Sequence, residues 1–213
     1  MKNKIASLFI LIIVALAFAM GVFYYPQLPV NISSHWGASG EVNGYMTKFW
    51  GIFLIPLIML AMLILYFFIP LIDPLKNNIH DFRKYYNGFW ILFELFFLYM
   101  FSLTIIYNLG YFFNFTSAML PALAILFFCI GSFLKKIKRN YFVGIRTPWT
   151  LANDTVWDKT HKLGGILFQI VGMLALLGLF TQGDSIIFLI IVPAIGTAII
   201  TFIYSYIEFK KLK

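Results

Sequence analysis

Six apolar stretches, each long enough to cross a lipid bilayer, constrain this chain more than any other feature of its sequence. A hydrocarbon core about 30 Å thick needs about 20 helical residues to span it. The stretches are Ile5–Phe23, Phe49–Ile72, Phe89–Tyr107, Ala118–Leu134, Gly164–Phe180 and Ile186–Ile207. Because backbone groups in hydrocarbon must be hydrogen-bonded within the segment, we predict an all-α integral membrane protein, a bundle of six transmembrane helices.

The composition supports this class and excludes others. Of 213 residues, 62% are hydrophobic and only 11% are charged, whereas about 25% are charged in a typical soluble domain. A soluble fold of this length cannot bury so much apolar surface, which argues against a soluble enzyme, a disordered chain or a fibrous repeat. The single cysteine, Cys129, provides no disulfide framework or thiolate cluster.

The first stretch also has features of a signal peptide. Lys2 and Lys4 precede the apolar run, and Ala17-Phe18-Ala19 could serve as a small-residue cleavage site. The run continues to Phe23 and is long enough to span a bilayer. We therefore expect this segment to be retained as the first transmembrane helix.

The distribution of lysine and arginine predicts the orientation. If both termini are cytoplasmic, 15 of the 16 basic residues fall on cytoplasmic segments and only Lys48 lies outside, as the positive-inside rule requires. Anionic cytoplasmic lipid accounts for the same excess. We predict a multi-pass membrane protein with the lipid bilayer as a partner. No direct nucleic-acid partner is expected, because no cytoplasmic segment exceeds about 30 residues.

This topology divides the chain into four regions. Residues 1–72 hold the first two transmembrane helices with the extracellular loop 24–48, and residues 73–134 hold the third and fourth. Residues 135–163 form a cytoplasmic loop with a short interfacial helix. Residues 164–213 hold the last two helices and a basic tail.

The extracellular loop is too patterned to be a simple connector. Three glycines permit tight turns with positive φ: Gly37, Gly40 and Gly44. His35 and Glu41 are too few to close a metal site, so we expect no metal. Loops on rigid scaffolds often carry binding, and the candidate ligand-facing residues here are His35, Trp36, Gly40, Glu41 and Tyr45.

The cytoplasmic loop contains a second patterned segment. A solvated connector would not expose Tyr141, Phe142, Ile145 and Trp149, so the segment should pack against the bundle. After it, Asn153 or Asp154 can cap a short interfacial helix that runs to about Leu163 and leads into the fifth span.

Three polar residues leave alternatives open. Arg146 fits a structural clamp on helix-end carbonyls better than a ligand contact, and His161 fits a helix-surface histidine better than a catalytic base. Glu94 lies inside the third span, where an ionisable group pairs or lines a polar path. It could form an ion pair with Lys84 or Arg146, or belong to a proton or substrate path. No catalytic motif is present, so we expect no catalytic residue and no cofactor.

Both loops resemble known sequences. The runs Asn140–Leu151 and Val156–His161 resemble the signature of the SdpI family of bacterial membrane immunity proteins. The segment from Pro29 to Lys48 resembles a domain of unknown function at the front of many members. Aspartate is common there at the position of Asn43, which argues against a carboxylate-based role for this site.

This resemblance implies a location in the bacterial cell membrane and a function. Members protect a cell against a secreted peptide toxin and act as receptors that sequester a transcriptional repressor at the membrane. The extracellular loop would then face the toxin. The cytoplasmic signature would bind the repressor or stabilise the fold, and its residues are Asn140, Gly144, Arg146, Thr147, Pro148, Trp149, Trp157, Lys159 and His161. One alternative is a transporter that exports the toxin with Glu94 on its path, and another is a membrane enzyme that modifies the peptide through His35 and Glu41.

Overall fold

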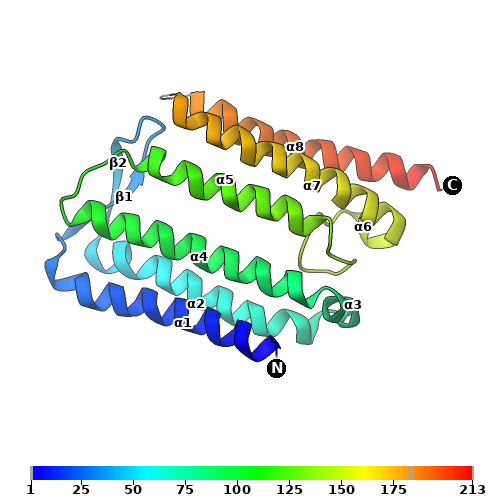
Figure 1. Ribbon diagram of the computed structural model, residues 1–213, viewed down its shortest axis with the longest axis horizontal. Helices are drawn as coiled ribbons and strands as arrows, with labels where there is room; N and C mark the ends of the chain where they lie inside the picture. Colours follow the sequence, from blue (N-terminus) through cyan, green and yellow to red (C-terminus); the bar gives the residue numbers. More distant parts are fainter. Residues whose placement is uncertain (1, 182, 184, 213) are drawn as a thin grey trace.

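The computed structural model describes residues 2–181, 183 and 185–212, and consists of long helices with a small hairpin at one end (Figure 1). The elements, in chain order, are α1 (Lys2–Tyr24), η1 (Tyr25–Gln27), β1 (Asn31–Trp36), β2 (Val42–Thr47), α2 (Lys48–Ile72), α3 (Lys76–Asp81), α4 (Arg83–Asn108), α5 (Phe115–Leu134), α6 (Pro148–Ala152), α7 (Asp154–Leu177), η2 (Gly178–Phe180) and α8 (Ser185–Lys210). Within the described residues, six helices are long and apolar enough to cross a membrane. The predicted six-span, mainly helical membrane protein is thus confirmed, while the cytoplasmic position of the termini stays a prediction.

The six long helices form two groups of three. Helices α1, α2 and α4 contact one another and are called the first unit, and α5, α7 and α8 form the second unit (Figure 1). Helices α4 and α5 meet between them, and we call this contact the seam. The first unit has the larger buried core, which includes Ile10, Met59, Tyr66 and Phe101.

Glycines allow α5 and α7 to approach closely. A Cβ atom added to Gly131 would lie 2.4 Å from the carbonyl oxygen of Gly165, and one added to Gly165 would lie 2.6 Å from that of Gly131. Further along α7, a Cβ on Gly172 would lie 2.7 Å from the carbonyl oxygen of Ala124. Small residues are the usual means by which transmembrane helices bring their backbones into contact.

The start of α7 differs from the prediction. A separate interfacial helix ending near Leu163 was expected, but one continuous helix runs from Asp154 to Leu177. Asn153 caps it as expected, since its side chain accepts from the backbone N–H groups of Thr155 and Val156. The glycine pair at 164–165 does not interrupt the helix, because its small residues fit against neighbouring chain segments.

The segment predicted as the extracellular loop contains an antiparallel hairpin that the sequence pattern did not predict. Strands β1 and β2 pair from Asn31 with Thr47 to Trp36 with Val42, with irregularities around His35. Positive φ occurs at Gly40, but not at Gly37 or Gly44, so that part of the glycine prediction is wrong. Gly44 is held in the extended conformation by strand pairing.

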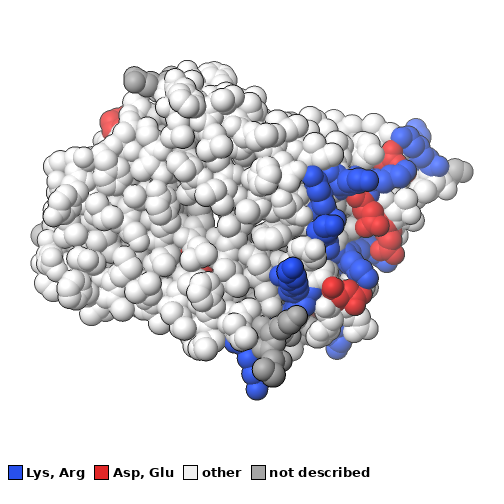
Figure 2. Space-filling model, viewed as in Figure 1, with Lys and Arg blue, Asp and Glu red and all other residues white. Residues whose placement is uncertain are grey.

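Charged side chains gather at one end of the molecule. Figure 2 shows Lys and Arg at the end that carries α3, α6 and both termini, while the rest of the visible face is almost free of them. We call this the basic end and the opposite end, with β1 and β2, the hairpin end. The sorting fits the charge bias from which the orientation is predicted.

Candidate functional site

The hairpin is fastened to the first unit by backbone and side-chain contacts. The side-chain oxygen of Asn108, at the end of α4, accepts from the N–H of Ser33 at 2.8 Å, and its amide nitrogen donates to the carbonyl of Ser33 at 3.1 Å. Ile32 is fully buried, and a Cβ on Gly51 of α2 would lie 2.5 Å from its side chain. The hairpin is therefore a fixed part of the bundle and not a loose loop.

The tip of the hairpin is fastened to the second unit. The amide nitrogen of Asn114 donates to the carbonyl of Ser39 at 2.8 Å, and the hydroxyl of Thr116 donates to the carbonyl of Gly37 at 2.8 Å. Asn114 also caps α5. Trp36 stacks on Phe115 with ring centroids 3.7 Å apart. The hairpin thus spans the seam.

The five residues predicted to face a ligand have different positions. His35, Glu41 and Tyr45 are exposed, and the exposed fraction of Tyr45 is 65%. Trp36 is half-buried in its stack, with an indole nitrogen that has no partner among the described residues. Gly40 forms the turn at φ +88°, and a Cβ there would collide with the side chain of Asn114. Accessible chemistry at this end therefore comes from His35, Glu41 and Tyr45.

His35 and Glu41 do not form a joint site. The Nδ1 atom of His35 is hydrogen-bonded to the side chain of Asn43 across the hairpin, while the carboxylate of Glu41 lies against Gly37 in the turn. Within the part of the chain that the structure describes, no group of three or more potential metal ligands is found. Each side chain is available only as a separate surface group.

At the basic end, residues 135–153 form the signature loop, which turns around the buried side chain of Asn140. Its oxygen accepts from the N–H groups of Phe142 and Val143 at 2.9 and 2.7 Å. Its nitrogen donates to the carbonyls of Lys138 and Val143, both at 2.9 Å. One fully buried amide thereby holds the loop in shape.

The signature loop is joined to the first unit through the residues that follow α2. Asp73 is almost fully buried and accepts from the backbone N–H of Tyr141 at 2.9 Å. Asn78 donates to the carbonyl of Arg139 at 2.8 Å. Lys138 forms an exposed ion pair with Asp81 at 2.8 Å.

The other side of the signature loop packs on α8 of the second unit. Thr147, the N-cap of α6, donates to the hydroxyl of Ser205 at 2.9 Å. Pro148 begins that short helix, and Trp149 contacts the rings of Phe202 and Tyr206 at centroid distances of 5.2 and 5.0 Å. The predicted packing against the bundle is confirmed for Phe142, Ile145 and Trp149, whereas Tyr141 is exposed, contrary to the prediction. The loop spans the seam as the hairpin does at the opposite end.

His161 is buried, so the prediction of a surface histidine is wrong. Its Nδ1 atom lies 2.8 Å from the carbonyl oxygen of Trp157 and carries the proton, while Nε2 accepts from the N–H of Ile145 at 2.9 Å. Trp157 stacks on the same ring and donates to the carbonyl of Ile137 at 3.0 Å. Gly144 has φ +114°, and a Cβ there would lie 2.4 Å from Nε2 of His161. These residues form the support beneath the loop.

Two charged members of the signature remain exposed. Arg146 donates to the carbonyl of Tyr141 at 2.7 Å, so its bond is to a loop carbonyl and not to the helix end that was predicted. Lys159 pairs with Glu208 of α8 at 2.7 Å. With Pro148, these side chains are the accessible part of the signature.

Glu94 is fully buried in α4, and neither of its oxygens has a partner among the described residues. The predicted ion pair with Lys84 or Arg146 is not among the pairs that the described residues form. The indole nitrogen of Trp90, one turn away, is also buried and has no hydrogen-bond partner in the described part of the chain. Two unsatisfied polar groups on one face of α4 require an explanation.

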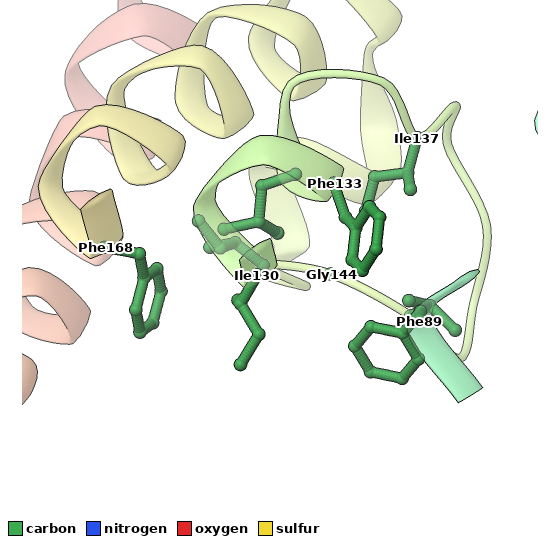
Figure 3. Close-up of a pocket in the computed structure, with 9 residues that line it drawn as sticks. Phe89, Ile130, Phe133, Ile137, Gly144 and Phe168 are labelled. Carbon is green, nitrogen blue, oxygen red and sulfur yellow. The ribbon is translucent and has the colours of Figure 1, made fainter. Parts of the chain in front are cut away.

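An apolar pocket of about 210 Å³ lies at the basic end, beneath the signature loop (Figure 3). It is lined by residues of α4, α5, α7 and the signature loop: Phe89, Ile130, Phe133, Leu134, Ile137, Val143, Gly144, Ile145 and Phe168. The two units are therefore incompletely packed against each other here.

The sequence interpretation missed several connecting residues. Asp73, Asn108 and Ser205 each bind a patterned segment from a distant element. Asp73 follows an apolar span directly, which is a position where a buried carboxylate needs hydrogen-bond donors. The other two have ordinary surroundings in the sequence and leave no such signal.

These features define a multi-pass membrane protein whose two three-helix units are joined at both ends by patterned segments. Comparison with known sequences then confirms the family resemblance. The SdpI/YfhL protein family matches residues 136–205, and a domain of unknown function (DUF1648) matches residues 12–60. The Immunity protein SdpI of Bacillus subtilis (strain 168) is 29% identical over 214 aligned residues, which cover 100% of this chain and 98% of the relative. No solved structure matches the chain.

Proposed function

We propose that this protein is a membrane immunity protein that protects its cell against a secreted peptide toxin. The observation that carries the proposal is the end-to-end similarity to Immunity protein SdpI. The two family matches contain the hairpin and most of the signature loop, so the similarity includes the segments that join the units. The proposed activity is binding and not catalysis.

The toxin-binding surface is assigned to the hairpin end. His35, Glu41 and Tyr45 are exposed on a hairpin that α2, α4 and α5 hold in place. A fixed surface loses little conformational entropy when a ligand binds. An aromatic ring, an imidazole and a carboxylate provide both apolar and polar contacts for a peptide.

The proposed test is survival of a toxin-sensitive strain that expresses the protein. Wild type should restore growth, and the triple variant His35→Ala, Glu41→Ala, Tyr45→Ala should lose most of this protection while inserting normally. Thr155→Ala, an exposed substitution at the basic end, is the control and should protect fully. Killing despite normal insertion of wild type would overturn the proposal. Toxin recovered intact by mass spectrometry fits binding, whereas modified toxin contradicts it.

The proposal extends to a receptor that sequesters a transcriptional repressor at the opposite end. Both patterned segments span the seam, so toxin bound to the hairpin can favour one arrangement of the two units over another. A repressor that binds only that arrangement would be recruited when toxin is present. The accessible residues for this contact are Arg146, Pro148 and Lys159.

Repressor localisation tests the receptor role. Arg146→Ala should release a fluorescent repressor from the membrane in toxin-treated cells, because Arg146 is exposed and supports only one loop carbonyl. Lys76→Ala removes an exposed charge at the start of α3, at the same end, and should leave recruitment intact. Equal recruitment in both variants would exclude Arg146 from the contact.

The unpartnered carboxyl of Glu94 favours one alternative, a transporter that exports the toxin with Glu94 on its path. Under this alternative, Glu94→Gln and collapse of the proton gradient should each abolish protection. Under the immunity proposal, both treatments leave protection unchanged.

A further inference from the structure

A second pocket, separate from the hairpin, opens at the basic end. It encloses about 520 Å³ and is lined by Leu134, Lys135, Lys136, Ile137, Lys138, Asp158, His161 and Lys162. Small-molecule sites commonly measure about 300–1,000 Å³. Four ammonium groups face one carboxylate, so the pocket carries a net positive charge.

Two of the four lysines are already engaged. Lys135 donates to the side-chain oxygen of Gln169 at 2.6 Å, and Lys138 pairs with Asp81. Lys136 and Lys162 are exposed and form no ion pair or hydrogen bond in the described part of the chain. His161 uses both ring nitrogens on the backbone, so the pocket offers two free ammonium groups.

The walls of this basic pocket are shared with the apolar pocket shown in Figure 3. Leu134 and Ile137 line both. Leu134 is the last residue of α5 and of its candidate span, which places the basic pocket at the level of the lipid headgroups. A positively charged pocket and an apolar pocket therefore adjoin at the membrane boundary.

We propose that these adjoining pockets bind one anionic phospholipid, with its phosphate between Lys136 and Lys162 and an acyl segment against Leu134 and Ile137. Lysine is a common phosphate ligand and acts as a point charge. Basic pockets between transmembrane helices bind anionic headgroups. A free phosphate ion would leave the apolar pocket unused. The proposal does not depend on the immunity function.

Lipid binding to the full-length protein in detergent tests this site. Phosphatidylglycerol, phosphatidylcholine and inorganic phosphate are titrated separately, and bound lipid is measured by native mass spectrometry together with the thermal unfolding midpoint. Wild type should retain phosphatidylglycerol in preference to phosphatidylcholine, with a rise in the midpoint that inorganic phosphate does not reproduce. The double variant Lys136→Gln, Lys162→Gln should bind about thirtyfold more weakly, which corresponds to about a fivefold to sixfold loss per removed charge.

Two control variants make the result specific. Lys76→Gln with Lys84→Gln removes the same charge from exposed positions outside the pocket and should bind like wild type. Asp158→Asn removes the only acid of the pocket lining and should bind more tightly. Equal weakening in the two double variants would show general attraction to the basic end and overturn the site. If inorganic phosphate alone raised the unfolding midpoint as much as phosphatidylglycerol does, the proposal that the ligand is a lipid would be overturned.

Discussion

The amide of Asn140 shows how much of the basic end depends on a single side chain. It is fully buried and satisfies two N–H groups and two carbonyls around the turn of the signature loop. Glu94 is the opposite case, since it is equally buried and has no partner among the described residues. The Asn140 side chain therefore stabilises the structure, whereas burial of the Glu94 carboxyl group without a hydrogen bond destabilises it.

Asn140→Ala should lower the free energy of unfolding by about 2–3 kcal/mol, because buried backbone groups would lose their partners. The measurement is unfolding in detergent micelles, monitored by circular dichroism. Asn77→Ala, an exposed asparagine of α3 with no side-chain bond in the described structure, should change stability by less than about 0.5 kcal/mol. A similar loss in both variants would contradict the assigned role.

Glu94→Met should raise the free energy of unfolding by about 1–3 kcal/mol, because an apolar side chain of similar length removes two unsatisfied oxygens from the bundle. The same unfolding assay applies. A large destabilisation would mean that the carboxyl group has a stabilising partner, such as a bound water.

At the scale of elements, backbone contact between α5 and α7 determines how the second unit assembles. Gly131 and Gly165 face each other, and Gly172 lies against the next turns of α5. Without a strong hydrophobic driving force inside the bilayer, such van der Waals contact is what holds helices together. The same contact keeps α7 continuous through a glycine pair.

Gly165→Ala should therefore destabilise the protein by about 1–3 kcal/mol, because the new methyl group would lie 2.6 Å from the carbonyl oxygen of Gly131 and force the helices apart. Gly196→Ala in α8 is the matched control. Its Cβ would meet nothing within 4 Å, so higher helix propensity should stabilise it by up to about 1 kcal/mol. Shifts of the unfolding midpoint in the same direction for the two variants would refute this account of the α5–α7 contact.

At the scale of the whole molecule, the two units are joined at both ends of the seam by segments that come from far apart in the chain. The hairpin lies between α1 and α2, and the signature loop lies between α5 and α7. On one side the hairpin contacts α4 and the signature loop contacts the residues that follow α2, and on the other side both contact the second unit. Such a pair of connections allows the two ends to respond to each other, as the proposed receptor requires.

The proposed roles also require the two ends to lie on opposite sides of the membrane. In a Cys129→Ser background, Ser39→Cys at the hairpin end should react with an impermeant thiol reagent on intact cells. Thr155→Cys at the basic end should react only after the membrane is opened. Both positions are exposed in the structure, so access depends on sidedness alone. The reverse pattern would overturn the orientation and the assignment of both surfaces.

Much of the fold could be predicted because it depends on local properties. The six spans, the cap at Asn153 and the packing of Trp149 all follow from residues close together in the chain. The β hairpin, the continuous α7 and the burial of His161 could not be predicted. Each depends on a contact with a distant element, and hydropathy does not report such contacts.

The sequence by itself determined the class of protein. Backbone groups in hydrocarbon must be hydrogen-bonded to other backbone groups, and each of the six apolar runs meets this condition by forming a helix. The tertiary structure decided which of the patterned residues remain accessible. Trp157 and His161 are buried beneath the signature loop, while Arg146 and Lys159 are open to a partner. The physical reason is that the membrane acts on each segment separately, whereas burial and access at the two ends arise only when distant elements of the two units come together.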